Sequence, residues 1–475
     1  MNKNWHWCLL FVGLAVIIRF PTFFLSVIDH DESTYLVIAD EWLNGKTLYK
    51  DLIDLKPPGI FLIFAAYIKL FGESIFGLRV FGSVIIGLTA FMLFLVLKKF
   101  ELRNRSACFA GLAYLLMTTF HFSLAVNTEI FMNFFHVLAF LLVFQFRNTV
   151  GWFGFGLLFG LSFCVKYLAL FDYVFLGAFC LYSFTDRNEL FSAKNITRLA
   201  LTGLGFVLPF FLTNLYFYAT ENFEEFAFIT YEAPGNYVAE VQWTDRLLYF
   251  LNMNVTFIFF AVPFYFGIFS NQTKRPVKIL AALWFASALI NTQITGQFFS
   301  HYYLHFSPGL ALGCGLFFEL KNRRLFNSVR VRKPALAGFY TISAIASLMF
   351  LLNYFEYYKR EDFAREIADE VRPQLNPDDE IFPANNLQIL YFLLNKTPVT
   401  PYVHSTILTK KVHVNTLEIN LPKEYEKIKK RSPKFILVEK HHPVRSFEKF
   451  IQANYYLAKK FGKKYFLYKR REISK

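Results

Sequence analysis

Residues Ile28–Gly59 read IDHDESTYLVIADEWLNGKTLYKDLIDLKPPG and form a polar stretch between two strongly apolar parts of the chain. A carboxylate beside a lipid bilayer is costly unless it faces water or a partner group. The stretch is therefore either a solvated loop with a helix cap or a site at the mouth of a helical bundle. Its acidic residues, with one that follows shortly after it, are Asp29, Asp31, Glu32, Asp40, Glu41, Asp51, Asp54 and Glu73.

The composition around this stretch is that of a polytopic membrane protein. The chain has 475 residues, of which 55% are hydrophobic and 20% aromatic, with 62 phenylalanines, whereas soluble domains are about 45–50% apolar. The net charge of +15 does not predict a nucleic-acid partner, because membrane topology explains much of the basic excess. No cysteine pair has C-x-x-C spacing, so neither a disulfide framework nor a zinc site is expected; the five cysteines lie in apolar segments, at Cys8, Cys108, Cys164, Cys180 and Cys314.

A helix needs roughly 20 apolar residues to cross a bilayer. The first apolar run lacks a small-residue cleavage site, so we expect an anchor rather than a removable signal peptide. Two shorter helices are expected in the first outer loop, a surface helix at Ser33–Leu43 and an interfacial or re-entrant one at Pro57–Phe71. The pattern predicts about eleven spans, at Trp5–Leu25, Ile75–Leu97, Ser106–Phe120, Glu129–Phe146, Gly151–Val165, Leu168–Phe184, Leu199–Ala219, Leu247–Phe269, Ile279–Ile294, Tyr302–Phe318 and Pro334–Phe355.

The distribution of lysine and arginine predicts the orientation in a plasma or inner membrane. Basic short loops alternate with loops that are poor in both residues, and the loop Glu221–Asp245 carries acids with no lysine or arginine. Basic loops face the cytoplasm, which places the first outer loop, the Glu221 loop and the C-terminal region outside. The cytoplasmic set is Lys98, Lys99, Arg103, Arg105, Arg147, Arg187, Lys194, Arg198, Lys274, Arg275, Lys278, Lys321, Arg323, Arg324, Arg330, Arg332 and Lys333.

The chain changes character near Glu356. We expect a transmembrane domain over residues 1–355, with its first outer loop at 28–74, and a small extracytoplasmic α/β domain over 356–475. An amphipathic helix is predicted at Phe363–Val371, and short strands or helices at Glu380–Pro383, Ile389–Leu394 and Lys434–Val438. The basic surface of this domain either contacts anionic headgroups of membrane lipids or only aids solubility.

The adjacent acids Asp31 and Glu32, followed by Tyr35 at helical spacing, are the first candidate site. Such a pair suits a general base beside a group that tunes it, although Asp31 or Ser33 as a helix cap would explain the same pattern. Lys56 precedes two prolines, which stiffen the backbone. A fixed lysine there suits a lipid phosphate, and a snorkelling interfacial lysine is the alternative.

Further candidates lie at helix ends on the same predicted outer face. Glu129 follows Asn127-Thr128 at a helix start, where the helix dipole alone favours a carboxylate. Lys166 and Asp172 flank a turn and are expected to form a mutual ion pair, although a lysine there is also able to hold a phosphate. His301, Tyr302 and Tyr303 offer hydrogen bonds to a phosphate or sugar, with an interfacial aromatic belt as the alternative, favoured for Tyr303.

These residues, in this order, resemble the GT-C class of membrane glycosyltransferases, in the branch of protein O-mannosyltransferases and aminoarabinose transferases that modify lipid A. The resemblance covers nearly the whole chain and depends on the order of several motifs rather than on one of them. The motifs are Asp31-Glu32 with Tyr35, Lys56-Pro57-Pro58, Phe71-Gly72 with Leu78-Arg79, Asn127-Thr128-Glu129, His301-Tyr302-Tyr303 with Pro308, and Pro377-Asp378-Asp379.

The resemblance implies a helical bundle with interfacial helices in the first outer loop, and a sugar donor carried on a polyprenyl phosphate. It implies that Asp31 activates an acceptor hydroxyl with help from Glu32, and that Lys56 contacts the donor phosphate near His301 and Tyr302. The reaction implied is inverting. Asp29 competes with Asp31 for the role of base, because it lies two residues before it.

The acceptor, whether lipid, glycan or protein, is not identified by the sequence. No cofactor and no metal cluster is assigned, although the acids of the first loop are able to bind a divalent cation. A transporter or flippase of lipid-linked sugars is the alternative function, but such proteins usually place their charges at the membrane midplane within inverted repeats. A non-catalytic assembly or sensor protein is a further alternative.

Overall fold

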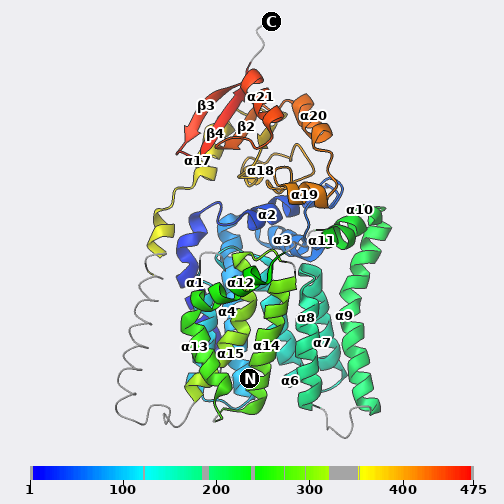
Figure 1. Ribbon diagram of the computed structural model, residues 1–475, viewed down its shortest axis with the longest axis vertical. Coiled ribbons are helices and arrows are strands. Elements are labelled where there is room, and N and C mark those ends of the chain that lie inside the picture. The colour runs from blue at the N-terminus through cyan, green and yellow to red at the C-terminus, as the bar shows by residue number, and fades with distance from the viewer. Residues whose placement is uncertain are drawn as a thin grey trace. The chain divides into compact units, whose positions relative to one another are not determined.

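The computed structural model describes residues 4–120, 123–184, 192–236, 241–271, 273–294, 296–319, 351 and 354–471 (Figure 1). The chain forms two compact units, each built from segments that are far apart in the sequence. Unit 1 comprises Met1–Phe23, Phe76–Thr213 and Ala239–Lys359, and unit 2 comprises Phe24–Ile75, Asn214–Val238 and Arg360–Lys475. The predicted first outer loop and the C-terminal residues are thus grouped in one unit, while the domain boundary predicted at residues 355–356 stays a prediction.

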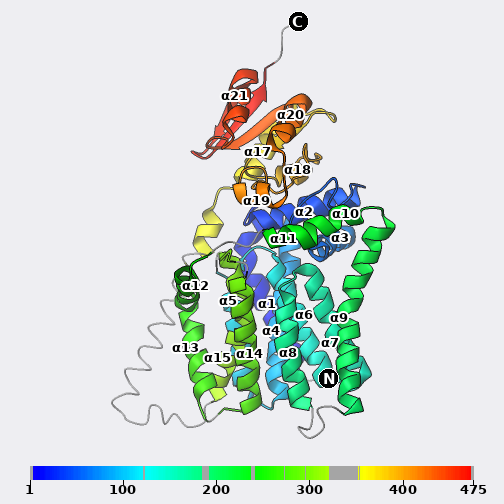
Figure 2. The ribbon, with the colours of Figure 1, turned by 45° about the vertical axis from the view of Figure 1, so that its right-hand side comes forward.

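Unit 1 is helical throughout its described part. Its helices α6 and α7 pack against each other, and α15 packs against α5, α13 and α14; the ribbon views show these helices running side by side (Figure 2). The bounds are α1 (Trp5–Arg19), η1 (Phe20–Phe24), α4 (Ile75–Lys99), α5 (Asn104–Met117), α6 (Thr128–Gln145), α7 (Thr149–Val165), α8 (Ala169–Phe184), α9 (Ala193–Ala219), α12 (Trp243–Thr256), α13 (Ile258–Phe269), α14 (Arg275–Ile294), η5 (Ser300–Phe306) and α15 (Ser307–Glu319).

The apolar helices make this an integral membrane protein. Among the described residues, five helices are long and apolar enough to cross a bilayer, or six if the bent pair α12–α13 counts as one span. The helices α3, α7 and α8 are apolar but shorter. The predicted count of about eleven spans is therefore not confirmed, and the predicted span Pro334–Phe355 falls mostly outside the described residues.

Two of the predicted spans are divided into separate helices in the structure. The predicted helix Leu247–Phe269 is two helices, α12 and α13, bent by 95° at Phe257. Polar side chains that compete for backbone hydrogen bonds weaken a helix end, and Asn254 in the last turn of α12 donates to the Phe250 carbonyl. The predicted helix Tyr302–Phe318 begins as the tighter η5, and α15 starts only at Ser307, directly before Pro308, a residue that suits a first helical turn.

Glycines let α7 and α9 approach closely. A Cβ atom at Gly156 would lie 2.0 Å from the Thr202 carbonyl oxygen, and one at Gly205 would lie 2.3 Å from the Phe153 carbonyl oxygen. Helices within membranes associate through such small residues, because lipid tails remove the hydrophobic drive for association. The contact between α7 and α9 therefore depends on the absence of side chains at these positions.

Unit 2 contains a four-stranded sheet with strand order β1-β2-β4-β3. The strands β1 and β2 are parallel, whereas β4 pairs antiparallel with both β2 and β3. The elements of unit 2 are α2 (His30–Leu43), α3 (Pro58–Phe71), α10 (Phe223–Ala227), the π-helix η4 (Phe228–Glu232), α11 (Ala233–Asn236), α17 (Phe363–Val371), η7 (Arg372–Gln374), β1 (Ile381–Pro383), α18 (Leu390–Leu393), α19 (Lys411–Thr416), α20 (Leu421–Arg431), β2 (Phe435–Glu439), α21 (Arg445–Asn454), β3 (Tyr455–Phe461) and β4 (Tyr465–Arg470).

The structure agrees with the predicted elements of the C-terminal region only in part. The helix Phe363–Val371 has the predicted bounds, β1 lies within the predicted segment Glu380–Pro383, and β2 overlaps Lys434–Val438 but ends one residue later. The hairpin of β3 and β4 was not predicted, because the interior residues of β3 are all exposed and show no alternation of buried and exposed positions. A small sheet is therefore present, while an independent α/β domain is not confirmed.

The helices α2 and α3 form the part of unit 2 that carries the first candidate site. The buried ring of Tyr35 on α2 packs edge-on against Phe61 and Phe64 of α3, with centroid distances of 5.9 and 5.5 Å. The loop between them is held by a hydrogen bond from the Asn222 side chain to the Leu48 carbonyl. These contacts fix the loop that leads to Lys56.

We expect Gly205→Ala to destabilise the protein by about 1–3 kcal/mol, because overpacking a close contact forces the backbone to shift. The matched control is Gly203→Ala on the same helix, where a Cβ atom would have nothing within 4 Å. That control should be neutral or stabilising by up to about 1 kcal/mol, because alanine favours a helix over glycine. Thermal unfolding in detergent measures both, and equal effects of the two substitutions would contradict close packing of α7 on α9.

Candidate functional site

Asp31 lies in the first turn of α2 and is contacted by side chains from three stretches of unit 2. Its Oδ2 accepts hydrogen bonds from Lys56 Nζ at 2.8 Å and from the Tyr35 hydroxyl at 3.1 Å. Its Oδ1 lies 3.2 Å from Nε2 of His404. We refer to Asp31, Tyr35, Lys56 and His404 as the Asp31 cluster. The side chains of Lys56 and Asp31 are only 23% and 17% exposed, so their attraction is screened less than that of a surface pair.

The start of α2 explains where Asp31 points. Asp29 is the N-cap, and its side chain accepts a hydrogen bond from the Asp31 backbone N–H at 2.7 Å. The alternative that Asp31 or Ser33 caps this helix is therefore wrong, and the helix begins at His30 rather than at Ser33. With Asp29 capping, the Asp31 side chain is left to contact the Asp31 cluster while the helix dipole favours its negative charge.

The backbone of Lys56 is held in place by two hydrogen bonds. The Tyr49 hydroxyl donates to the Lys56 carbonyl oxygen at 2.8 Å, and the Lys56 N–H donates to Oδ1 of Asp54 at 3.1 Å. Pro57 follows in an extended conformation and caps α3, which starts at Pro58. The stiff Pro57-Pro58 pair expected from the sequence thus ends a loop that presents the Lys56 ammonium group to Asp31.

Several acids of the first loop are buried. Burial, followed by the neighbouring Asp31 carboxylate, raises the pKa of Asp29 to about 7. Burial also raises the pKa of Asp54, and Glu32 is only 2% exposed. Asp29 therefore exchanges its proton near neutral pH, next to the carboxylate that we consider as a base.

A second cluster lies in unit 1, around the buried Glu129 in the first turn of α6. Its Oε1 accepts a hydrogen bond from Lys166 Nζ at 2.5 Å and lies 3.8 Å from Nε2 of His305 and 4.0 Å from Nε2 of His301. Lys166 Nζ also lies 3.8 Å from the centroid of the Tyr302 ring, which is a cation–π contact. We refer to these five residues as the Glu129 cluster.

The predicted ion pair between Lys166 and Asp172 is wrong. Lys166 pairs with Glu129, while Asp172 accepts hydrogen bonds from Ser287 at 2.6 Å and from Asn291 at 2.7 Å. The reason is helical geometry: Lys166 ends α7 and Asp172 lies in the first turn of α8, so the turn directs them to different neighbours. Asp172 faces α14, and Lys166 reaches α6.

The structure therefore brings the predicted site residues together in two groups. Asp31, Tyr35 and Lys56 are in contact, with Asp29 beside them, and Glu129, Lys166, His301 and Tyr302 are in contact. Tyr303 is not in either group, because its ring packs on Tyr249 with a centroid distance of 4.7 Å, within the hydrophobic core. Their roles in binding and catalysis stay predictions.

Two histidines of these clusters were missed by the sequence analysis. His404 lies in the stretch Pro401-Tyr402-Val403-His404, which carries no recognisable motif. His305 lies two residues after Tyr303, in the tight helix η5. Its spacing of four from His301 would place both histidines on one helical face, which is the signal that was available.

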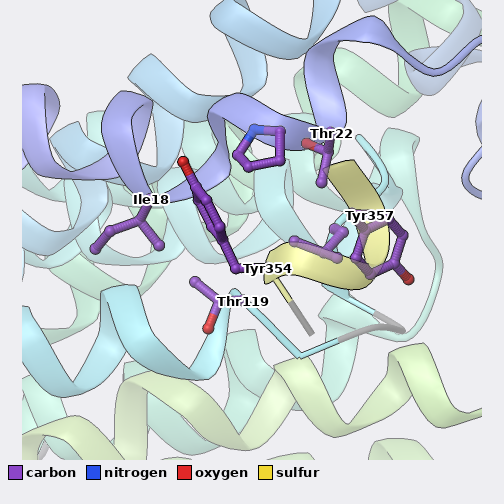
Figure 3. A pocket seen from close by; sticks show the side chains of 7 residues that line it. Ile18, Thr22, Thr119, Tyr354 and Tyr357 are labelled. Carbon is purple, nitrogen blue, oxygen red and sulfur yellow. The ribbon is translucent and has the colours of Figure 1, made fainter. Parts of the chain in front are cut away.

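Within the described residues, no group of three or more histidine, cysteine, aspartate or glutamate side chains is arranged to hold a metal ion. A small cavity of about 20 Å³ lies elsewhere in unit 1, lined by Ile18, Pro21, Thr22, Thr119, Leu124, Tyr354 and Tyr357 (Figure 3). That volume admits about one water molecule and is too small for a sugar.

Comparison with known proteins adds one sequence match and several structural matches. Residues 55–217 match the family model described as dolichyl-phosphate-mannose-protein mannosyltransferase, a range that includes Lys56, Glu129 and Lys166. No curated protein sequence matches this chain.

The structural matches cover almost the whole chain. The crystal structure of ArnT from Cupriavidus metallidurans bound to undecaprenyl phosphate is 14% identical with a TM-score of 0.65, and 98% of each chain is covered. The apo structure of the same protein gives the same values. A crystal structure of the Archaeoglobus fulgidus oligosaccharyltransferase tethered to an acceptor peptide is 12% identical with a TM-score of 0.52, and covers 92% of this chain and 69% of that one.

At these identities the structural matches show a shared fold. The family match places part of that fold, from Lys56 through α9, in a recognised group of glycosyltransferase sequences. Taken together, the partial sequence match and the full-length fold confirm that this chain resembles the GT-C class of membrane glycosyltransferases, in its O-mannosyltransferase and ArnT-like branch.

Proposed function

We propose that this protein is an integral-membrane glycosyltransferase that moves a sugar from a polyprenyl-phosphate donor to a hydroxyl group of a lipid, glycan or protein acceptor on the outer face of the membrane. The observation that carries the proposal is the contact of Lys56 and Asp31 in the first loop. Lys56 Nζ, which is able to bind a phosphate, lies 2.8 Å from Oδ2 of Asp31, which is able to accept a proton from a hydroxyl group. The similar ArnT structure is bound to undecaprenyl phosphate, which supports a lipid-phosphate donor.

The proposed reaction needs little covalent help from the protein. Asp31 accepts the proton of the acceptor hydroxyl, the oxygen attacks the anomeric carbon, and the bond from that carbon to the phosphate oxygen breaks with inversion. The negative charge on the departing phosphate is met by the Lys56 ammonium group. Since phosphate is a good leaving group, orientation and charge stabilisation are the main contributions required.

The Asp31 cluster explains how one carboxylate serves as a base beside a lysine. While Lys56 contacts Oδ2, the carboxylate is held in its charged form. A donor phosphate competes with Asp31 for the same ammonium group, and a carboxylate that loses a cationic partner becomes a stronger base. The proposal therefore links binding of the donor to activation of the acceptor.

The Glu129 cluster has a more limited proposed role. The resemblance implies that His301 and Tyr302 contact the donor, and Lys166 is a second candidate for its phosphate. Glu129 already neutralises Lys166 and is itself almost completely buried, and a buried charge is costly to leave without its partner. We therefore propose that Glu129 orients Lys166, and that His301 and Tyr302 supply polar contacts.

We expect Asp31→Asn to lower sugar transfer by about 10²–10⁴-fold, the usual contribution of a general base. The assay measures release of polyprenyl phosphate by purified protein in nanodiscs, supplied with a panel of polyprenyl-phosphate sugars. The matched control is Asp51→Asn, the same chemical change in the same loop, where the exposed Asp51 side chain accepts a hydrogen bond from the Thr47 N–H. Asparagine keeps that acceptor, so the control should retain activity.

Normal activity of a folded Asp31→Asn variant would show that Asp31 is not the base. If no donor is turned over by the wild type, while lipid-linked sugar crosses the membrane in a flipping assay, the transporter becomes the better description. Equal thermal unfolding of the variant and the wild type is the check on folding.

Asp29 is expected to act as a cap and not as the base. Asparagine is also a good N-cap, so Asp29→Asn should keep sugar transfer within about tenfold of wild type. Burial and the Asp31 carboxylate raise the pKa of Asp29 to about 7. Between the ordinary pKa of an aspartate and about pH 7, the folded state therefore binds more protons than the unfolded state. Folding stability linked to Asp29 is therefore lost as the pH rises through this window.

The Asp29→Asn variant should remove that loss. Its unfolding temperature should exceed that of wild type by more at pH 8 than at pH 5, because pH 5 lies near the lower end of this window. Thermal unfolding in detergent measures both, with Asp51→Asn as the control. A loss of transfer as large as that of Asp31→Asn, in a stable Asp29→Asn protein, would instead assign the base to Asp29.

A further inference from the structure

His404 lies at Asp31 although the two residues are 373 positions apart in the sequence. The segment that carries His404 is attached to the first loop by a backbone hydrogen bond from the Ile53 N–H to the Pro401 carbonyl oxygen, 2.7 Å long. The His404 side chain is 12% exposed. A C-terminal segment therefore contributes a partly buried polar group to the candidate base of the first loop.

The contacts of the imidazole determine which nitrogen carries the proton. Nδ1 of His404 lies 3.2 Å from the backbone nitrogen of Thr406. Because a backbone N–H only donates, Nδ1 must be an acceptor. The proton of the neutral ring is consequently on Nε2, and it is donated to Oδ1 of Asp31. The Thr406 hydroxyl also lies 3.0 Å from the same Nδ1, which fixes the ring from its far side.

The surroundings of His404 contain charges of both signs. His30 and Asp31 face it from α2, Asp54 and Lys56 belong to the loop before α3, and His413 faces it from α19. Nδ1 of His413 lies 3.2 Å from the same Thr406 hydroxyl. Burial lowers the pKa of His413 to about 4, so His413 is a neutral neighbour at physiological pH.

We infer that His404 is a positioning residue for Asp31 in the transfer reaction: its Nε2–H holds Oδ1 while the Tyr35 hydroxyl holds Oδ2, which fixes the plane of the carboxylate even after a donor phosphate has drawn Lys56 away. This inference rests on the proposed function, and it gives the C-terminal segment a direct part in the site. A carboxylate fixed on both oxygens presents the acceptor with one orientation, and a misplacement of about 1 Å in such a group costs on the order of 10²-fold in rate.

Two substitutions of His404 separate the Asp31 contact from the Thr406 contact. In His404→Gln the amide nitrogen occupies the place of Nε2 and still donates to Asp31. In His404→Asn the shorter side chain reaches the position of Nδ1, so it still accepts from the Thr406 N–H but does not reach Asp31. The inference predicts a loss of kcat of about 10–100-fold for His404→Asn with KM for the donor within about threefold, and activity within about tenfold of wild type for His404→Gln.

The double variant Asp31→Asn/His404→Asn provides the decisive comparison. If His404 acts through Asp31, His404→Asn should have no further effect once Asp31 is replaced, because the two residues then behave as one unit. The inference would be overturned if the activity losses of the two single variants multiply in the double variant, or if His404→Asn keeps full activity. It would also be overturned if a folded His404→Gln protein loses more than tenfold in activity. If His404→Asn does not fold, the tenfold limit for His404→Gln decides alone.

A spectroscopic measurement separates failure of this inference from failure of the proposed function. Ring ¹⁵N NMR of histidine-labelled protein, with the His404 signals assigned by comparison with His404→Gln, reads the tautomer without any substrate. A protonated Nε2 and an unprotonated Nδ1 are expected, and a proton on Nδ1 would overturn the contact with Asp31. If the expected tautomer is found but no donor is turned over, the proposed function fails while the contact stands.

Discussion

The interaction on which the candidate site depends is the ion pair of Asp31 and Lys56. Two opposite charges that are mostly shielded from water are stable only together, because each alone would lose its hydration without compensation. The pair requires α2 to begin at His30, Tyr49 to hold the Lys56 carbonyl oxygen, and Pro57-Pro58 to start α3 directly afterwards. The polar stretch of the first loop is thus shaped around one partly buried contact between charges.

The same physical rule accounts for the Glu129 cluster in unit 1. Glu129 is almost completely buried at the start of a membrane helix, and the ammonium group of Lys166 supplies its counter-charge. The buried Asp172 carboxyl group is stabilised instead by hydrogen bonds from Ser287 and Asn291. An ionisable group within membrane helices marks a functional site by default, but the contacts distinguish a carboxylate paired with a cation from one held by neutral donors.

The comparisons and the contacts support the function in different ways. The fold shared with ArnT and with an archaeal oligosaccharyltransferase provides the architecture, and a fold by itself hosts many activities. The chemistry of the site supports the function more directly, because a carboxylate, a lysine and a histidine from three stretches of the chain meet in one unit. His404 also shows that the C-terminal segment, for which the sequence predicted a small α/β domain but no site residue, takes part in that convergence.

The sequence alone determined the properties that depend on local patterns. Apolar length predicted several helices, such as α4, α6 and α7, to within a few residues, the acidic and proline-flanked motifs singled out Asp31, Lys56 and Glu129, and motif order identified the class. Only the tertiary structure decided the pairing of Lys166 with Glu129, the bend at Phe257, the capping by Asp29 and the presence of His404 at Asp31. The reason is that helical period and composition act over a few turns, whereas the partner of a buried charge is chosen by packing between segments that are up to 373 residues apart.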